Sequence, residues 1–271
     1  MLNLIYLPVL YFCLLLYFRL AAHFQITDKP NHRSSHHQIT IRGGGIVFPL
    51  ALLIHFLLYG FEYPFFTSGL LLISLISFYD DLKPLSNKLR LLIHLISVSL
   101  LFMQTDLMYY SLWIIIPVYI LVIGTINAYN FMDGINGITG AYSMITILSL
   151  YFINESQLSF IKGDWLIVSA LALLVFSFFN FRKKAKCFAG DVGSVSMAFI
   201  IIFFLLLLII QSGDLKYIGL LLIYGLDTVS TIIFRLIRRE NIFEAHRSHF
   251  YQYLANVKGW PHLQVSSLYM L

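Results

Sequence analysis

Charged residues are scarce in this sequence. Only 11% of its 271 residues are charged, whereas an ordinary soluble domain has about 25%, so most of the folded surface cannot face water. Hydrophobic residues make up 59%, in continuous runs close to the roughly 20 residues that a helix needs to cross a hydrocarbon core. The composition therefore excludes an ordinary soluble domain and predicts an all-α fold, a polytopic transmembrane helical bundle.

Cysteine is almost absent, and so are the signs of a secretory leader. Cys13 lies in an apolar run and Cys187 in a basic loop, which excludes a disulfide framework and a cysteine metal site. The first apolar run, 4–22, has no positive residue before it and no small-residue cleavage pattern after it, so we expect it to stay attached. The net charge of +5 fits basic loops that face anionic lipid headgroups and does not indicate nucleic acid.

The apolar runs predict about nine complete spans plus the start of a tenth near Leu263. The nine cover residues 4–22, 44–60, 64–79, 89–103, 111–127, 137–153, 164–181, 192–210 and 215–234. The tenth would be cut short at Leu271, which predicts a truncated carboxyl end. Because no internal repeat or soluble extension stands out, residues 1–271 are expected to form a single integral-membrane domain.

Basic residues predict the orientation. With the amino terminus outside, sixteen of the eighteen Lys and Arg fall in inner loops, and Lys162 and Lys216 fall outside. The cytoplasmic loops would then carry nearly all the unusual polar residues. These loops contain the segments DKPNHRSSHHQITIRGGG, YDDLKPLSNKLR, NAYNFMDGINGITG, FNFRKKAKCFAGDVGS and RRENIFEAHRSHFYQYL.

Two adjacent carboxylates, Asp80 and Asp81, follow directly on the third apolar run. They repel each other, and the helix dipole opposes acidic residues at a carboxyl end, so a divalent cation or a basic partner is expected to compensate. Lys83, Lys88 and Arg90 are close in the sequence. The alternative is a solvated helix end.

A second motif lies where the fifth span is expected to end. Asn127, Asn130 and Asp133 recur every three residues, which places them near one helical face. Amide and carboxylate groups suit recognition of a nucleotide base or sugar, and Asp133 could also approach a metal. A polar turn that caps the next helix is the alternative.

Asp191 stands between Gly190 and Gly193 at the expected start of the eighth span. Such a position is often an N-cap. At the same depth as the other carboxylates, Asp191 could instead complete a Mg²⁺ site of oxygen ligands. The residue alone leaves both explanations open.

The fourth motif, EAHRSHFYQ, places His246, Arg247 and His249 after the ninth span. Zinc is disfavoured because no cysteine or third histidine has matching spacing. A guanidinium between two imidazoles suits a diphosphate better, through bidentate contacts and hydrogen bonds. A basic loop that faces lipid is the alternative.

Two further features have open interpretations. Gly43, Gly44 and Gly45 could bring backbone N–H groups to a phosphate, but no strand is expected before them, so helix packing or a hinge explains them as well. Asp227 stands inside the ninth apolar run, where an ionisable residue is costly. We interpret it as a buried polar partner.

Taken in this order, the four motifs resemble those of the polyprenyl-phosphate N-acetylhexosamine-1-phosphate transferases, the membrane glycosyltransferase family 4. The resemblance covers residues 28–253, and HRSHFYQ is most similar to the bacterial O-antigen and UDP-HexNAc branch. The resemblance implies a UDP-N-acetylhexosamine donor, undecaprenyl phosphate as acceptor, and Mg²⁺, with Mn²⁺ as an alternative cofactor. Transfer in the bacterial inner membrane would release UMP and begin synthesis of a cell-envelope polysaccharide.

The resemblance also implies roles for residues. Asp80, Asp81 and Asp133 would be catalytic, and Asp191 and Asp81 would bind the metal. The implied substrate-binding residues are Asn127, Asn130, Asn180, Lys88, His246, Arg247 and His249. One departure is that Arg182, Lys183 and Lys184 precede the GD motif where relatives often have proline.

An ion- or proton-coupled transporter is the main alternative function, because membrane carboxylates and histidines often carry ions. Transporter sites usually lie near the midplane, whereas these groups gather at one boundary. A non-catalytic membrane scaffold is a third interpretation. Direct transfer and transfer through a covalent aspartyl intermediate are both compatible with the sequence, as are several UDP-sugars and oligomeric states.

Overall fold

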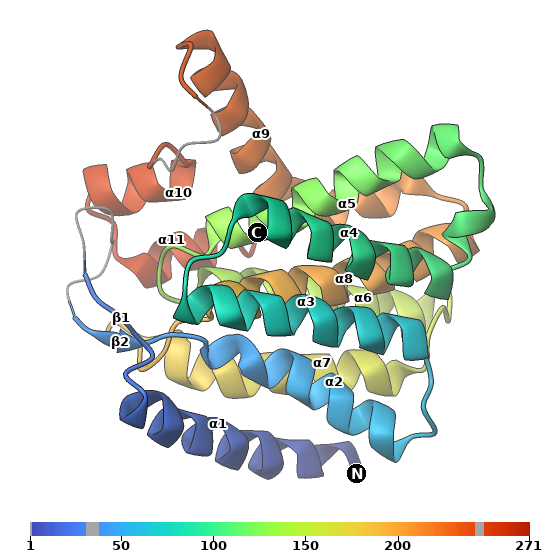
Figure 1. Ribbon diagram of the computed structural model, residues 1–271, viewed down its shortest axis with the longest axis horizontal. Helices are drawn as coiled ribbons and strands as arrows, with labels where there is room; N and C mark the ends of the chain where they lie inside the picture. Colours follow the sequence, from blue (N-terminus) through green and yellow to red (C-terminus); the bar gives the residue numbers. More distant parts are fainter. Residues whose placement is uncertain (1, 31–37, 242–246) are drawn as a thin grey trace.

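The computed structural model describes residues 2–30, 38–241 and 247–271. Long α-helices dominate the described residues, and the strands form one short antiparallel pair (Figure 1). The α-helices are α1 (Tyr6–His23), α2 (Val47–Leu58), α3 (Pro64–Leu82), α4 (Asn87–Gln104), α5 (Leu112–Met132), α6 (Ile138–Ser156), α7 (Gly163–Asn180), α8 (Gly190–Ser212), α9 (Leu222–Ile237), α10 (Phe250–Gln252) and α11 (His262–Leu268). The other elements are η1 (Leu2–Ile5), η2 (Gly44–Ile46), η3 (Leu107–Tyr109), η4 (Leu215–Leu221), the π-helical η5 (Tyr253–Val257), β1 (Thr27–Asp28) and β2 (Thr40–Ile41).

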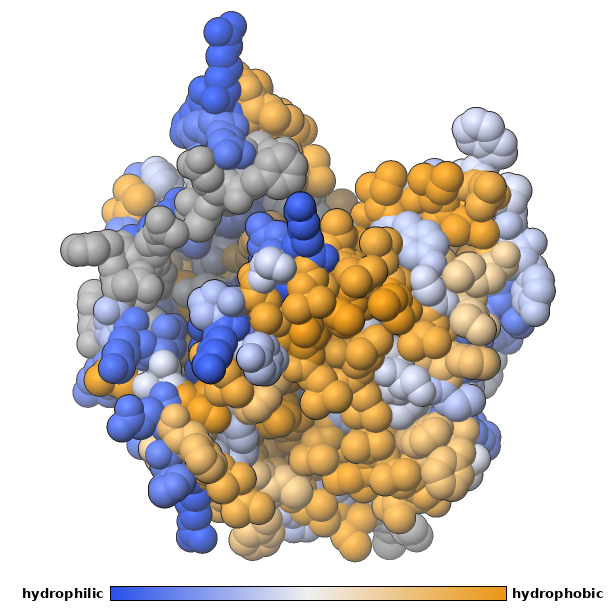
Figure 2. All heavy atoms as spheres, in the orientation of Figure 1, coloured by the Kyte–Doolittle hydropathy of each residue, from blue (hydrophilic) through white to orange (hydrophobic). Residues whose placement is uncertain are grey.

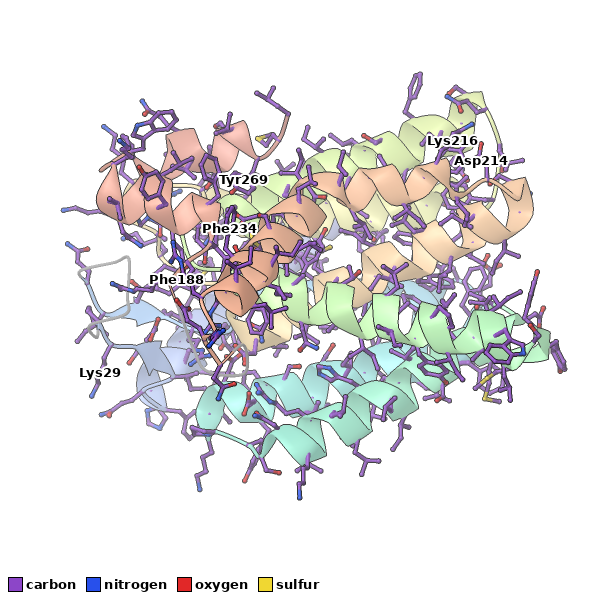
Figure 3. The ribbon with its side chains drawn as sticks, turned by 90° about the horizontal axis from the view of Figure 1, so that it is seen from above. Lys29, Phe188, Asp214, Lys216, Phe234 and Tyr269 are labelled. Atoms are coloured by element: carbon purple, nitrogen blue, oxygen red, sulfur yellow. The ribbon has the colours of Figure 1, made fainter. Side chains whose placement is uncertain are left out.

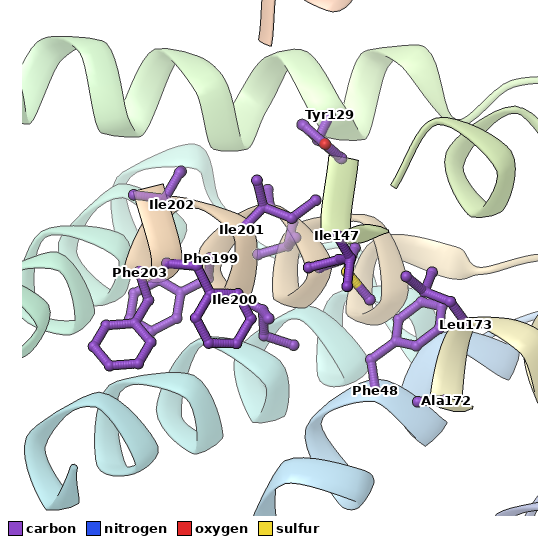
Figure 4. Packing of buried hydrophobic residues seen from close by; sticks show 14 of the residues in the cluster. Phe48, Tyr129, Ile147, Ala172, Leu173, Phe199, Ile200, Ile201, Ile202 and Phe203 are labelled. Atoms are coloured by element: carbon purple, nitrogen blue, oxygen red, sulfur yellow. The ribbon is translucent and has the colours of Figure 1, made fainter. Parts of the chain in front are cut away.

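Helix α8 is the centre of the bundle. Its sequence is apolar on all sides, and 78% of its span is buried, against 28% of the span that contains α1. Phe199 and Phe203 stack on Phe66 of α3, and other side chains of α8 pack against α2, α5 and α6 (Figure 4). An apolar helix of a membrane protein can face lipid or protein, and α8 faces protein over most of its length. The first turn of α8, which contains Asp191, is therefore held in place by its neighbours.

Every predicted span coincides largely with a helix, but not every helix is shown to cross a membrane. Among the described residues, six helices are long and apolar enough: 3–23, 64–82, 112–132, 163–180, 190–212 and 215–237. The apolar helix at 44–58 is shorter, and α4 and α6 fall outside the six because their polar ends lower the mean hydropathy. The count of nine spans stays a prediction. The segment predicted to begin a tenth span forms the seven-residue helix α11, which packs against α6.

Large apolar side chains cover the outside of the helices. Phe12, Leu75, Trp113 and Ile120 are each at least 67% exposed. Figure 2 shows apolar side chains across this face, with hydrophilic ones mainly near the strands and at the far tip of α9. Water-soluble monomers rarely expose such large contiguous apolar surface. Together with the long apolar helices, this confirms an all-α, multi-pass membrane protein.

The polar motifs gather at one end of the helices. Figure 3 shows Lys29, Phe188 and Tyr269 at this end, and Asp214 and Lys216 at the opposite end. The strand pair, α10 and α11 also lie at the end with Lys29 (Figure 1), whereas α9 projects away from the bundle. We call this the motif end of the protein.

The glycine triplet is a packing seam at the motif end. The N–H groups of Gly44 and Gly45 donate to the carbonyls of Phe188 and Ala189, at 2.8 and 3.0 Å. A Cβ atom on Gly45 would lie 2.2 Å from the Cα of Gly193, closer than side chains tolerate. The triplet therefore fits its backbone against the start of α8, and two of its N–H groups are used within the protein.

We expect Gly45→Ala to destabilise the protein by about 1–3 kcal/mol, because its methyl group must push the backbone of Gly193 away. Thermal unfolding of the detergent-purified protein measures this as a lower midpoint. Gly124→Ala in α5 is the matched control, since its Cβ would meet no described atom within 4 Å and alanine is the better helix former. Equal midpoints for the two variants would show that the seam is not tightly packed.

Candidate active site

The two adjacent carboxylates lie in the last turn of α3, and both are sheltered from solvent. The side chain of Asp81 is 0% exposed and that of Asp80 is 8% exposed. Asp81 accepts hydrogen bonds from the backbone N–H groups of Asp191 (2.9 Å) and Val192 (3.1 Å), in the first turn of α8. The first N–H groups of a helix lack partners inside the helix and carry partial positive charge. Asp81 is therefore a cap for α8 supplied by another helix, and not a solvated helix end.

Arg42 joins this cap to a second carboxylate. Its Nε lies 2.6 Å from Oδ1 of Asp81, and one terminal nitrogen lies 3.0 Å from Oδ1 of Asp191. Burial alone would lower the pKa of the Arg42 guanidinium, but the charges of Asp81 and Asp191 raise this pKa above its ordinary value. Arg42 is thus held as a cation between the ends of α3 and α8.

Arg90 neutralises the other member of the pair. It lies 2.8 Å from Oδ2 of Asp80, while the N–H of Leu85 donates to Oδ1 of Asp80 at 2.6 Å. The same Arg90 nitrogen is 4.0 Å from Oδ2 of Asp191, and the carboxylates of Asp80 and Asp191 also interact. Three carboxylates and two guanidiniums from α3, α4, α8 and the segment after β2 therefore form one charged cluster.

The motif at the end of α5 reaches this cluster in part. Oδ1 of Asn130 accepts from the hydroxyl of Ser194 on α8 at 3.4 Å, whereas Asn127 donates to the carbonyl of Ile123 in its own helix at 3.0 Å. Asp133 directly follows α5 as its C-cap. Protein packed around it raises the pKa of the Asp133 carboxyl to about 7, and the charge of Asp191 acts in the same direction. Asp133 and Asn130 thus adjoin the cluster.

Asn180 bonds within the protein at both ends of its amide. Its Oδ1 accepts from the N–H of Gly137 at 2.8 Å, and its Nδ2 donates to the carbonyl of Cys187 at 2.8 Å. The turn it holds has a positive φ of 87° at Gly137, which glycine adopts easily. These contacts explain Asn180 as a clamp between two loops, while a direct contact with substrate stays a prediction.

Of the three predicted residues of the fourth motif, His249 is described and buried. Its Nδ1 lies 3.1 Å from Oδ1 of Asp227, which answers the question of what the carboxylate inside the ninth run binds. Arg247 is exposed, and His246 lies outside the described residues. Lys88 is exposed in the first turn of α4.

Tyr251 connects this histidine segment to the end of α5. Its hydroxyl donates to the carbonyl of Phe131 at 2.9 Å. A Cβ atom on Gly134 would lie 2.1 Å from the hydroxyl oxygen of Tyr251. Close packing on both sides of Asp133 thus fixes the segment after His249 beside the α5 motif.

The side chains of this cluster differ from a site that holds a metal ion by protein ligands alone. Among the described residues, no three His, Cys, Asp or Glu side chains are arranged to hold a metal ion. Mg²⁺, however, is usually bound by one or two carboxylates together with substrate phosphates. Asp191 fits that requirement, since its carboxylate lies beside that of Asp80 and its side chain is 17% exposed.

The sequence offered Arg90 as one of three basic residues near the carboxylate pair, and the structure pairs it with Asp80. The pairing of Arg42 with Asp81 and Asp191 and that of Asp227 with His249 were missed. Arg90 could have been assigned, because it lies ten residues after Asp80, one helical turn into α4. Arg42 pairs with Asp191 across 149 residues, and no local pattern signals a pair at that distance.

Removing the bridging cation tests the cluster. We expect Arg42→Gln to lower stability by about 3–5 kcal/mol, because the buried carboxylate of Asp81 loses its counter-charge. Arg42→Lys should lie between this variant and the wild type, since an ammonium cannot bridge two carboxylates in the same planar geometry. The measurement is the thermal midpoint in detergent, with Arg19→Gln, an exposed arginine of α1, as the control. Unchanged stability of Arg42→Gln would disprove the bridging role.

Comparison with known proteins places the chain in a family. Residues 63–209, more than half of the chain, match the family model described as glycosyl transferase family 4. A relative in Bacillus subtilis strain 168, "Probable undecaprenyl-phosphate N-acetylglucosaminyl 1-phosphate transferase", is 27% identical over 87% of this chain and 71% of its own. The undecaprenyl-phosphate alpha-N-acetylglucosaminyl 1-phosphate transferase of Thermotoga maritima is 26% identical over 89% of this chain and 77% of its own. The phospho-N-acetylmuramoyl-pentapeptide-transferase of Dictyoglomus thermophilum is 28% identical over 82% of this chain and 76% of its own. The chain therefore belongs to glycosyl transferase family 4.

Proposed function

We propose that this protein transfers N-acetylhexosamine 1-phosphate from a UDP-sugar to undecaprenyl phosphate, releasing UMP and forming a polyprenyl diphosphate sugar. The product would begin a cell-envelope polysaccharide. The observation that carries the proposal is the cluster of Asp80, Asp81, Asp191, Arg42 and Arg90 at the motif end. Two of the relatives, in Bacillus subtilis and Thermotoga maritima, are undecaprenyl-phosphate transferases by name, which supports it.

We place this site on the cytoplasmic face of a bacterial inner membrane, with the amino terminus outside. The support is the charge bias in the sequence, because sixteen of the eighteen Lys and Arg fall in the loops predicted to face inward. Lys216, one of the other two, lies at the end opposite Lys29 (Figure 3). A UDP-sugar is a cytosolic substrate. The acceptor phosphate would stay at headgroup level while its prenyl chain remains in the lipid.

The electrostatics of the reaction explain why cations are needed. The lipid phosphate and the UDP-sugar are both anions, and their negative charges must approach the same phosphorus. Preorganised cations in a poorly hydrated site stabilise such a transition state strongly. The side chains of Arg42 and Arg90 are each 34% exposed, so phosphate oxygens can reach guanidiniums that are already fixed by carboxylates.

In the proposed step, an oxygen of the lipid phosphate attacks the phosphorus that bears the sugar. A new P–O bond forms, the bond from this phosphorus to the bridging oxygen breaks, and UMP leaves with that oxygen and its electron pair. Any proton on the attacking phosphate passes to a carboxylate, for which we assign Asp133, because the pKa of its carboxyl is raised to about 7. Asp80, whose two oxygens contact Arg90 and the N–H of Leu85, would act by holding Arg90 in place. Both oxygens of Asp81 are occupied and its side chain is fully buried, so we assign Asp81 to positioning rather than to nucleophilic attack.

We propose that Mg²⁺, or Mn²⁺ in its place, binds together with the donor and is held by Asp191. When bound, the ion would neutralise phosphate oxygens that face the attacking group. The remaining roles belong to side chains. Asn127 and Asn130 would recognise the nucleotide, and Arg247 and His249, with His246, would contact the donor diphosphate.

Purified protein is expected to release UMP from a UDP-N-acetylhexosamine only when polyprenyl phosphate is present. Chelation of divalent cations should abolish release, and added Mg²⁺ should restore it. A coupled assay of UMP over a panel of UDP-sugars measures this directly. Release without the lipid, or full activity in excess chelator, would reject the proposed reaction or its metal requirement respectively.

The same assay tests the assignment of Asp191. Asp191→Asn should lower kcat by at least about a hundredfold, and extra Mg²⁺ should not restore it. Asp106→Asn is the matched control, because Asp106 is an exposed aspartate at the N-cap of η3, far from the motif end, and asparagine tolerates its left-handed φ of 57°. Comparable activity of Asp191→Asn and Asp106→Asn would remove Asp191 from the site.

A further inference from the structure

Asp227 is a buried carboxylate that the proposed reaction does not use. It lies in α9 and is 6% exposed, within a helix otherwise rich in apolar residues. A carboxylate in such surroundings is costly unless several donors compensate for its lost hydration. The hydrogen-bond donors around Asp227 therefore show which segments its carboxylate positions.

The contacts come from two segments outside α9, residues 249–251 and Tyr269. Oδ1 of Asp227 accepts from Nδ1 of His249 at 3.1 Å and from the backbone N–H of Phe250 at 2.9 Å. Oδ2 accepts from the hydroxyl of Tyr269 at 2.5 Å and from the N–H of Tyr251 at 3.3 Å. Asp227 thus caps α10 with backbone contacts and, through Tyr269, joins the residue after α11 to α9.

The contact with His249 determines the chemistry of its ring. A carboxylate can only accept, so Nδ1 of His249 must carry a proton, and Nε2 becomes the ring nitrogen that accepts when the ring is neutral and donates when it is charged. The ring is 3% exposed and lies with its centroid 5.8 Å from that of Tyr251, in a stacked arrangement. Its tautomer and its orientation are therefore both fixed by neighbours.

The same contacts place His249 relative to the rest of the site. Tyr251, whose N–H binds Asp227, reaches with its hydroxyl to the carbonyl of Phe131, two residues before Asp133. Asp227 therefore anchors a short path of hydrogen bonds that leads from the histidine to the end of α5.

We propose that Asp227 is a positioning residue for the donor side of the site. It holds His249 with Nδ1 protonated and Nε2 directed to the diphosphate of the UDP-sugar, and it acts on the reaction through His249. This inference rests on the proposed function and adds a residue to which neither the sequence motifs nor the family resemblance assigns a role.

The test is a double-mutant cycle of Asp227→Asn and His249→Ala in the transferase assay. In Asp227→Asn, the amide NH₂ replaces one of the two carboxylate oxygens and cannot accept a hydrogen bond. The substitution therefore loses the contact with the backbone N–H of Phe250 or with that of Tyr251, whichever way the amide turns. We expect Asp227→Asn to lower kcat/KM for the UDP-sugar by on the order of tenfold or more, with KM for the polyprenyl phosphate little changed. In the His249→Ala background the same substitution should cost almost nothing, because its effect passes through the missing ring.

Asp214→Asn is the matched control, since Asp214 lies at the opposite end of the helices, paired with Lys216, and its side chain is 41% exposed. Its activity should equal that of the wild type. Multiplicative losses in the double variant would show that Asp227 merely supports the fold, and full activity of Asp227→Asn would remove it from the site. Either outcome overturns the proposal.

A second measurement does not depend on activity. Histidine ¹⁵N spectra of the wild type, with the His249→Ala spectrum subtracted, should show a ring protonated at Nδ1, and Asp227→Asn should change this signal. An unchanged His249 signal would overturn the inference even if the enzyme were active. Conversely, wild-type protein without transferase activity would reject the proposed function, while the spectra would still test the Asp227–His249 pair.

Discussion

The buried first turn of α8 imposes the constraint on which the motif end depends. Helix α8 is surrounded by other helices, so its unpaired N–H groups cannot rely on bulk water. Asp81 supplies the missing acceptors, and Arg42 compensates the charge that Asp81 brings and ties it to Asp191. A structural requirement, the capping of a buried helix, thus collects the charges that a phosphate-transfer site needs.

This arrangement separates holding from reacting. Asp81 is saturated and buried, whereas the side chain of Asp191 is partly exposed and those of Arg42 and Arg90 are each 34% exposed. On the other side of the site, Asp227 likewise has a positioning role, because its carboxylate accepts a hydrogen bond from the ring of His249. The ion-transporter alternative rested on carboxylates and histidines within the membrane, and Asp227 is the carboxylate inside the ninth apolar run. Asp227 instead serves this local contact, and family membership favours an enzyme.

The sequence predicted what local patterns encode. Apolar runs located the helices, and the motif of Asp80 and Asp81 was expected to need a basic partner, which the structure provides. The sequence did not reveal which arginine pairs with each carboxylate. Arg42 contacts Asp191 across 149 residues, and that contact depends on the packing of the whole bundle. The glycine triplet had two open explanations for the same reason. Only the approach of Gly45 to Gly193 shows that it is a seam.

If the cluster at the motif end brings the two phosphates together, the phosphorus that bears the sugar must pass from the donor to the lipid. The measurement uses a UDP-N-acetylhexosamine labelled with ³²P at the phosphorus that bears the sugar, incubated with purified protein, Mg²⁺ and undecaprenyl phosphate. We expect the label to move into the lipid fraction as a polyprenyl diphosphate sugar, while the UMP that is released is unlabelled. Label that stays in the aqueous phase, as free sugar phosphate or as intact donor, would contradict it.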